Sequence, residues 1–173
     1  MILKFRFYLL LPLIVLQGCA NTLQNHPDVV SARANGVPIF IYGKYVDTPN
    51  SAGGVGVKFR FQNLSEKTIK YVYFEVVPYN EVGDVAHSEI GRKSRAILEY
   101  TGPVNANEYV PTAYWENVWY NSQINCIELK SVKVEFINGD LRVFGEDELR
   151  RVSTKNTQML IGDITESCDY KGE

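Results

Sequence analysis

Few residues of this chain are of the types that carry nucleophilic, acid–base or zinc chemistry. His26 and His87 are the only histidines, whereas a zinc site needs three or four ligands brought together. A cysteine nucleophile would have to be Cys126 or Cys168, and no Gly-x-Ser-x-Gly elbow offers a serine nucleophile. The sequence therefore predicts a protein that is not an enzyme and that holds neither a metal nor a cofactor.

The acidic and glycine-rich segments fit surface turns better than they fit sites. Asp84 and the pair Ser88-Glu89 could serve acid–base chemistry in principle, but carboxylates in turns are mostly solvated. Residues 145–148 are acidic and lack the spacing of an EF-hand. Residues 53–56 are glycine-rich, but they lack the lysine of a phosphate loop and no helix follows them. A hydrolase is therefore the weakest of the functional alternatives.

The segment with the strongest binding character is aromatic. Residues 114–120 contain Tyr114, Trp115, Trp119 and Tyr120, and aromatic side chains are enriched at interaction hot spots. On strand alternation the two tryptophans share one face and the two tyrosines the other. One set should be core, and the other is a candidate interaction site for a partner or a glycan. The favoured alternative places both tryptophans in the core or at a sheet edge.

The N-terminus has the layout of an export signal. Lys4 and Arg6 precede an apolar run over residues 7–16, interrupted by Pro12, and small Gly18 follows. The run is shorter than the roughly 20 apolar residues that span a bilayer. Residues 16–19 (LQGC) resemble the lipobox of bacterial lipoproteins, with Gln17 at a position where it is less usual. The resemblance implies a signal peptide over residues 1–18 and lipidation of Cys19.

The same resemblance implies a location. Several acyl chains on Cys19 would anchor the protein stably, because each buried CH₂ contributes roughly 0.8 kcal/mol. An aspartate after the lipidated cysteine would resemble an inner-membrane retention signal, and Ala20 stands there instead. We therefore expect a lipid-anchored protein of the cell envelope, at the outer membrane and facing the periplasm.

Length and charge limit what the mature chain can bind. Residues 19–173 suffice for one domain with a core of its own. The mature chain has 16 basic and 20 acidic residues, with no basic cluster, which argues against nucleic acid as a partner. We expect a lipidated, flexible tether over residues 19–36, a domain over 37–152 and a C-terminal tail over 153–173.

The two remaining cysteines form a candidate pair. Once Cys19 is lipidated, Cys126 and Cys168 are left, and an even pair in an oxidising compartment predicts a disulfide. Such a bridge would tie the C-terminal tail to the sheet. The alternative is two free thiols.

Hydrophobic periodicity predicts strands from residue 38 onward. Residues 55–61 alternate between apolar and polar or small side chains, as in a half-buried strand. Residues 68–77 are apolar or aromatic on both faces, which predicts a central strand in which Tyr71 and Tyr73 join an aromatic core. Residues 85–90 and 94–100 predict two shorter strands, and residues 101–103 (TGP) a firm stop.

The C-terminal half continues the pattern. Residues 124–137 switch their apolar face, which predicts a bulge near Lys130-Ser131. Asn138-Gly139 predicts a hairpin with a type I′ turn, and residues 146–152 predict a short helix. Seven or so strands at turn spacing predict an all-β fold, an antiparallel immunoglobulin-like β-sandwich with one short C-terminal helix.

Several stretches within residues 54–145 resemble a family. They are residues 59–65 (FRFQNLS), 67–72 (KTIKYV), 78–84 (PYNEVGD) and 100–103 (YTGP). They are similar to FxLYD-like β-sandwich modules of envelope and secreted proteins. The resemblance implies the fold and carries over no catalytic residue.

The function predicted is that of a non-catalytic interaction module or accessory subunit, with an envelope protein as partner. The main alternative is an assembly helper that adds an edge strand to a client. That role needs an unprotected edge, which lysine or proline would blunt.

Overall fold

The computed structural model describes residues 25–152 and Cys168. The predicted signal peptide and Cys19 lie outside the described residues, as do residues 153–167 and 169–173 of the predicted tail. Among the described residues, no helix combines the length and the apolar character that a membrane crossing requires.

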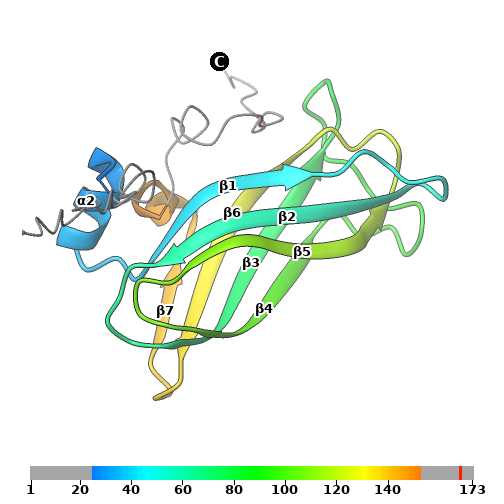
Figure 1. Cartoon of the computed structure of the whole chain (residues 1–173). Coiled ribbons are helices and arrows are strands. Elements are labelled where there is room, and N and C mark those ends of the chain that lie inside the picture. Colours follow the sequence, from blue (N-terminus) through cyan, green and yellow to red (C-terminus); the bar gives the residue numbers. More distant parts are fainter. Residues whose placement is uncertain (1–24, 153–167, 169–173) are drawn as a thin grey trace, which may run out of the picture.

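Two antiparallel sheets form the domain and lie face to face (Figure 1). The first has the order β1-β2-β5 and the second the order β4-β3-β6-β7. The strands are β1 (Ile39–Val46), β2 (Gly54–Asn63), β3 (Ile69–Tyr79), β4 (Ala96–Val104), β5 (Tyr109–Tyr120), β6 (Cys126–Phe136) and β7 (Leu141–Phe144). The all-β sandwich is confirmed. Its connectivity is immunoglobulin-like, except that β4 pairs with β3 instead of joining the sheet of β5 as in constant-type domains.

The alternation predicted for β2 is confirmed and builds the core. Its four apolar side chains, from Val55 to Phe61, are fully buried between the sheets. Phe59 stacks on Phe74 of β3 with ring centroids 4.3 Å apart. The prediction for Tyr71 and Tyr73 is wrong, because β3 turns Val72, Phe74 and Val76 inward and both tyrosines are only partly buried.

The region of β4 also differs from the prediction. Residues 85–90 contribute only an isolated bridge between Tyr79 and Val85. Strand β4 continues through Gly102 and Pro103, where a stop was expected. Proline is tolerated there because β4 is an edge strand, on which a missing N–H need not break the ladder. A Cβ on Gly102 would lie 2.6 Å from the carbonyl oxygen of Ile69, so only glycine fits this approach.

Strand β6 carries the predicted bulge. Glu75 pairs with Ser131 and Val76 with Leu129, which leaves Lys130 as the extra residue. The hairpin at Asn138-Gly139 is confirmed, but its turn is not type I′. Of these two residues only Gly139 has positive φ (87°), and its N–H donates to the Phe136 carbonyl at 3.0 Å. This arrangement is that of a hairpin whose loop is longer than two residues and ends in a β-bulge at the glycine.

The predicted flexible tether needs correction, because residues 27–34 form the helix α2 (Pro27–Ala34). The Asp28 N–H donates to His26 Nδ1 at 3.3 Å as an N-cap, and Val29 and Ala32 are buried in the core cluster. Arg33 ties the helix to the Leu64 carbonyl and to Asn107. Two buried apolar residues in one short helix give too weak a period to predict it.

The predicted C-terminal helix is a 3₁₀ helix, η1 (Glu146–Arg151). Figure 1 shows it at the same end of the sandwich as α2. Val152 follows it, and its carbonyl accepts a hydrogen bond of 2.6 Å from the Ile41 N–H of edge strand β1.

Candidate interaction surfaces

The aromatic segment of β5 divides as alternation predicts, in spite of a bulge. Trp119 lies opposite Val55 and Trp115 opposite Val57, so both tryptophans face the core. Asn117, at a positive φ of 52°, lies in the irregular stretch between them. Trp119 is only 1% exposed, so it is part of the core and cannot meet a partner.

Trp115 joins the two sheets. Its ring lies against Phe59 and Phe74, with centroids 6.2 and 5.9 Å away. Its indole N–H donates to the Glu99 carbonyl of edge strand β4 at 2.9 Å. The favoured prediction, that both tryptophans pack in the core or at a sheet edge, therefore holds for Trp119 in the core and for Trp115 at the edge. Trp115 also occupies an edge carbonyl that an added strand would need.

Tyr114 lies on the outer face of the first sheet and is 43% exposed. The Lys58 ammonium is 4.7 Å from its ring centroid and 2.6 Å from Asp47 Oδ1. A hydrogen bond to Asp47 and then burial raise the pKa of Tyr114 to about 12. Burial by itself would raise the pKa of Asp47, but Lys58 and Tyr114 lower it on balance. Tyr120, the other predicted tyrosine, is half-buried.

Two outer sheet faces thus carry charged, aromatic or aliphatic side chains. The Arg60 face is the outer face of β1-β2-β5 and comprises Tyr45, Lys58, Arg60, Thr112 and Tyr114. The Tyr73 face is the outer face of β4-β3-β6-β7 and comprises Tyr71, Tyr73, Ile97, Lys133, Leu141 and Val143.

The Tyr73 face has an aromatic centre and aliphatic ends. The rings of Tyr71 and Tyr73 lie 6.0 Å apart, and the Lys133 ammonium is 3.9 Å from the Tyr73 centroid. Ile97 on β4 is 68% exposed, while Leu141 and Val143 on β7 are 56% and 59% exposed. The sequence prediction missed this face because it assigned the tyrosines to the core.

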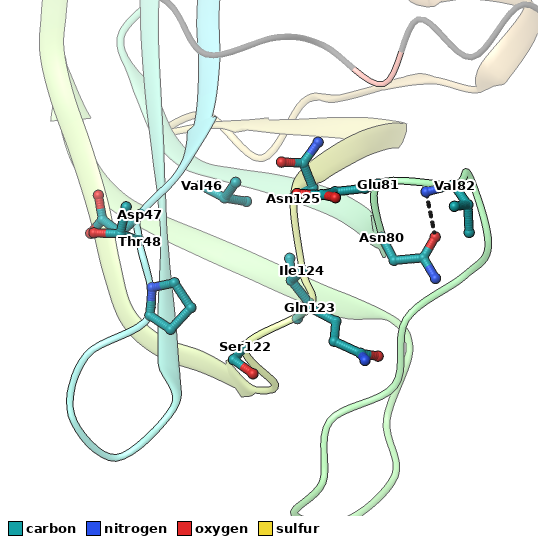
Figure 2. Close-up of a pocket in the computed structure, with 11 residues that line it drawn as sticks. Val46, Asp47, Thr48, Asn80, Glu81, Val82, Ser122, Gln123, Ile124 and Asn125 are labelled. Carbon is teal, nitrogen blue, oxygen red and sulfur yellow. Dashed lines mark hydrogen bonds between the residues drawn. The ribbon is translucent and has the colours of Figure 1, made fainter.

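A hollow of about 910 Å³ opens at the loop end of the sandwich. The loops after β1, β3 and β5 line it, and Figure 2 shows Asp47 on one side and Val82 on the other. The Asn80 side chain stabilises the loop after β3, because its Oδ1 accepts hydrogen bonds from the N–H groups of Val82 and Asp84.

The residues considered for hydrolysis do not converge in this hollow. His87 is exposed, and its carbonyl accepts from Asn121. Ser88 is buried, and its hydroxyl accepts from the Tyr120 N–H at 3.1 Å. Within residues 25–152 and Cys168, no three His, Cys, Asp or Glu side chains are placed to hold a metal.

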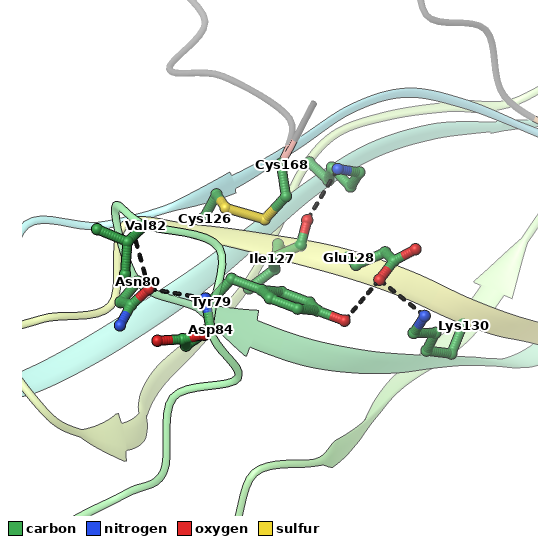
Figure 3. The surroundings of a disulfide bond; sticks show 10 residues. Tyr79, Asn80, Val82, Asp84, Cys126, Ile127, Glu128, Lys130 and Cys168 are labelled. Atoms are coloured by element: carbon green, nitrogen blue, oxygen red, sulfur yellow. Dashed lines mark hydrogen bonds and ion pairs between the residues drawn. A yellow bond between two sulfur atoms is a disulfide. The ribbon is translucent and has the colours of Figure 1, made fainter. Parts of the chain in front are cut away.

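The predicted disulfide between Cys126 and Cys168 is present (Figure 3). It lies at the start of β6, with the two Cα atoms 5.4 Å apart and Cys126 buried. Beside it the Tyr79 hydroxyl donates to Glu128 at 2.8 Å, and Glu128 also pairs with Lys130. Burial, then the Glu128 carboxylate, raise the pKa of Tyr79.

The fold and its surfaces define an immunoglobulin-like β-sandwich. Its two outer faces, the Arg60 face and the Tyr73 face, both carry aromatic and charged side chains. No family model matches the chain, and no curated protein matches it. The similarity to FxLYD-like modules stays a prediction.

Proposed function

We propose that this protein is a non-catalytic interaction module, anchored by lipid on Cys19 in a bacterial cell envelope. It would lie at the outer membrane, face the periplasm and bind a second envelope protein through its Tyr73 face. The observation that carries this proposal is the exposure of three aliphatic side chains on the strands of one sheet face.

The chemistry of the Tyr73 face favours a protein as its partner. Tyrosine supplies large contact area with few rotatable bonds, and interface cores are aromatic with a polar rim. Charges of both signs surround the centre, because Glu99 and Lys133 flank Tyr73 and Glu135 lies beside Tyr71. The fitting partner has an apolar centre and charges of both signs around it.

The face is tested with a photoreactive amino acid in place of Ile97, in cells that carry the full-length protein. We expect one crosslinked protein of defined mass, and its loss in Val143→Glu, because a carboxylate would be buried against the apolar centre. Val82→Glu is the matched control, since Val82 is 77% exposed and lies in a loop away from the face.

Three outcomes contradict the proposed face. They are a crosslink that survives Val143→Glu, a crosslink that both variants lose, and a product of twice the chain mass. The last would replace the second protein with a second copy of this chain.

Strand addition is the alternative that one observation favours, because β7 is the least protected edge. Trp115 covers β4, Val152 covers part of β1 and Pro111 interrupts β5, whereas β7 shows no such block in the described part of the chain. The Phe136 N–H pairs with the Asp140 carbonyl, so by alternation the Val143 N–H points away from β6. A partner retained in Val143→Glu and lost in Val143→Pro would indicate strand addition.

The anchor is tested separately with Cys19→Ser. We expect an unlipidated precursor that keeps residues 1–18, measured by intact-mass spectrometry. Cys168→Ser is the matched control, because it also replaces one cysteine by serine and should leave lipidation intact. Normal processing of Cys19→Ser would contradict the lipoprotein proposal.

A further inference from the structure

We infer that Arg60, on the sheet face opposite the proposed partner surface, forms a binding site for a ligand carboxylate. This inference goes beyond the proposed function and does not depend on it. Its basis is a partly buried arginine that the fold holds in place and that no carboxylate of the described residues neutralises.

The strand register fixes the position of Arg60. Arg60 on β2 pairs with Gly43 on β1, which has no side chain to cover it. The Tyr45 ring fills part of that space, since a Cβ on Gly43 would lie 2.7 Å from the Tyr45 hydroxyl. The guanidinium carbon of Arg60 is 5.0 Å from the Tyr45 ring centroid. A cation–π contact of this kind restricts the position of the guanidinium group before a ligand arrives.

The Arg60 guanidinium group lacks a carboxylate partner in the described part of the chain. Within residues 25–152 and Cys168, no carboxylate lies within 4.0 Å of the Arg60 guanidinium group. The Tyr45 hydroxyl is buried and, apart from its contact with the Arg60 guanidinium group, has no hydrogen-bond partner there. A ligand that supplied a carboxylate would therefore form a charge-assisted hydrogen-bonded pair with Arg60, which is stronger than a hydrogen bond between neutral groups. Burial raises the pKa of Tyr45, although the charge of Arg60 and its hydrogen bond to the hydroxyl oppose this, so the hydroxyl stays protonated at neutral pH.

A hollow of about 250 Å³ opens at these donors. Its lining includes Tyr45, Asp47, Lys58, Arg60, Pro111 and Thr112. The charge of Lys58 is neutralised by Asp47, at 2.6 Å. One positive charge, that of Arg60, therefore remains for a ligand.

The ligand class follows from this charge and from the shape of the donor. A guanidinium group binds carboxylate or phosphate through two parallel N–H···O bonds. A single net positive charge beside the Asp47 carboxylate matches a monoanion and disfavours a phosphate dianion. The site therefore fits a carboxylate, which an envelope could supply as a peptide C-terminus or as an acidic sugar.

Ligand-observed NMR with the full protein, purified from membranes in detergent, tests the site. The probes are N-acetyl-alanyl-alanine and its C-terminal amide, glucuronate and glucose, and inorganic phosphate. We expect one or both free acids to bind and the amide and glucose not to bind. The preference between the two acids then identifies the source of the carboxylate.

Arg60→Gln should weaken binding of the acid by about tenfold or more, because a hydrogen-bonded charge is lost. Arg142→Gln is the matched control, since Arg142 is exposed on β7 of the other sheet, and it should leave affinity unchanged. Tyr45→Phe removes only the hydroxyl and should cost a smaller factor, which keeps the test valid if Arg60→Gln folds poorly. Equal binding of acid and amide, binding of phosphate alone, unchanged affinity in both Arg60→Gln and Tyr45→Phe, or no binding of either acid would overturn the inference.

Discussion

Phe74→Ala should lower the free energy of unfolding by about 3–5 kcal/mol, the range for large aromatic side chains removed from a packed core. Phe74 has no exposed surface and stacks on Phe59 across the two sheets. It also contacts Phe61 and Trp115, so its loss opens a cavity among rings from β2 and β5. Urea denaturation followed by far-ultraviolet circular dichroism measures the change as a shift of the midpoint.

Tyr73→Ala is the internal control for this prediction. Tyr73 is the preceding residue on the same strand, but its ring lies on the opposite face, where water and the Lys133 side chain already surround it. We expect a clearly smaller loss of stability than for Phe74→Ala. Equal losses would contradict the assigned register, because a shift of one residue exchanges the two faces of a strand.

The two strands differ in how far their sequences determine a face. In β2 the alternation of apolar with polar residues identifies the buried side at once, because Lys58 and Arg60 can only point outward. In β3 both faces carry large apolar or aromatic residues, so periodicity identifies a central strand without showing which face is core. The Tyr73 face was therefore not predictable from β3 alone, and its aliphatic ends come from β4 and from the short strand β7.

An irregular feature was predictable where the residue pattern of a single strand shows it. The bulge at Lys130 changes the apolar face within β6 itself, so the sequence shows it. The path of β4 through Pro103 depends on its place at the edge of the sheet, which is a property of the assembled topology. Helix α2 depends on burial of Val29 and Ala32 against the sandwich, since eight residues are too few to form a stable helix alone.

The candidate sites show the same division. Alternation within one segment predicted that Trp115 and Trp119 lie on the face opposite Tyr114. It did not predict which of the two faces is buried. The Arg60 site requires the pairing of Arg60 with Gly43 and the position of Tyr45 beside it. Cross-strand register determines both, and no local pattern in the sequence encodes it.

Asn63→Ala should be nearly as damaging as the loss of a core ring, at about 3 kcal/mol or more. Asn63 has no exposed surface. Its Nδ2 lies 2.8–3.0 Å from the carbonyl oxygens of Lys67, Val104 and Asn105, and its Oδ1 accepts from the Ser65 N–H and hydroxyl. The side chain thus joins the β2–β3 turn to the end of β4, and alanine would leave the buried Val104 carbonyl and two part-buried carbonyls without this donor. Urea denaturation reports the loss.

Asn63→Asp and Asn50→Ala determine whether the donors of Asn63 are the cause. Asn63→Asp keeps the size and the acceptor but places a carboxylate against three carbonyl oxygens, so it should destabilise more than alanine at neutral pH. These oxygens favour the protonated acid and raise its folded-state pKa, so stability should recover as pH falls toward the ordinary aspartate value of about 4.

Asn50 also holds a turn, since its Oδ1 accepts from the N–H groups of Ala52 and Gly54, but it is exposed. Water can replace those bonds, so Asn50→Ala should cost about 1 kcal/mol or less. If the two alanine variants lost equal stability, or if Asn63→Asp matched the wild type at neutral pH, burial of the Asn63 amide would not be what holds the turn against β4.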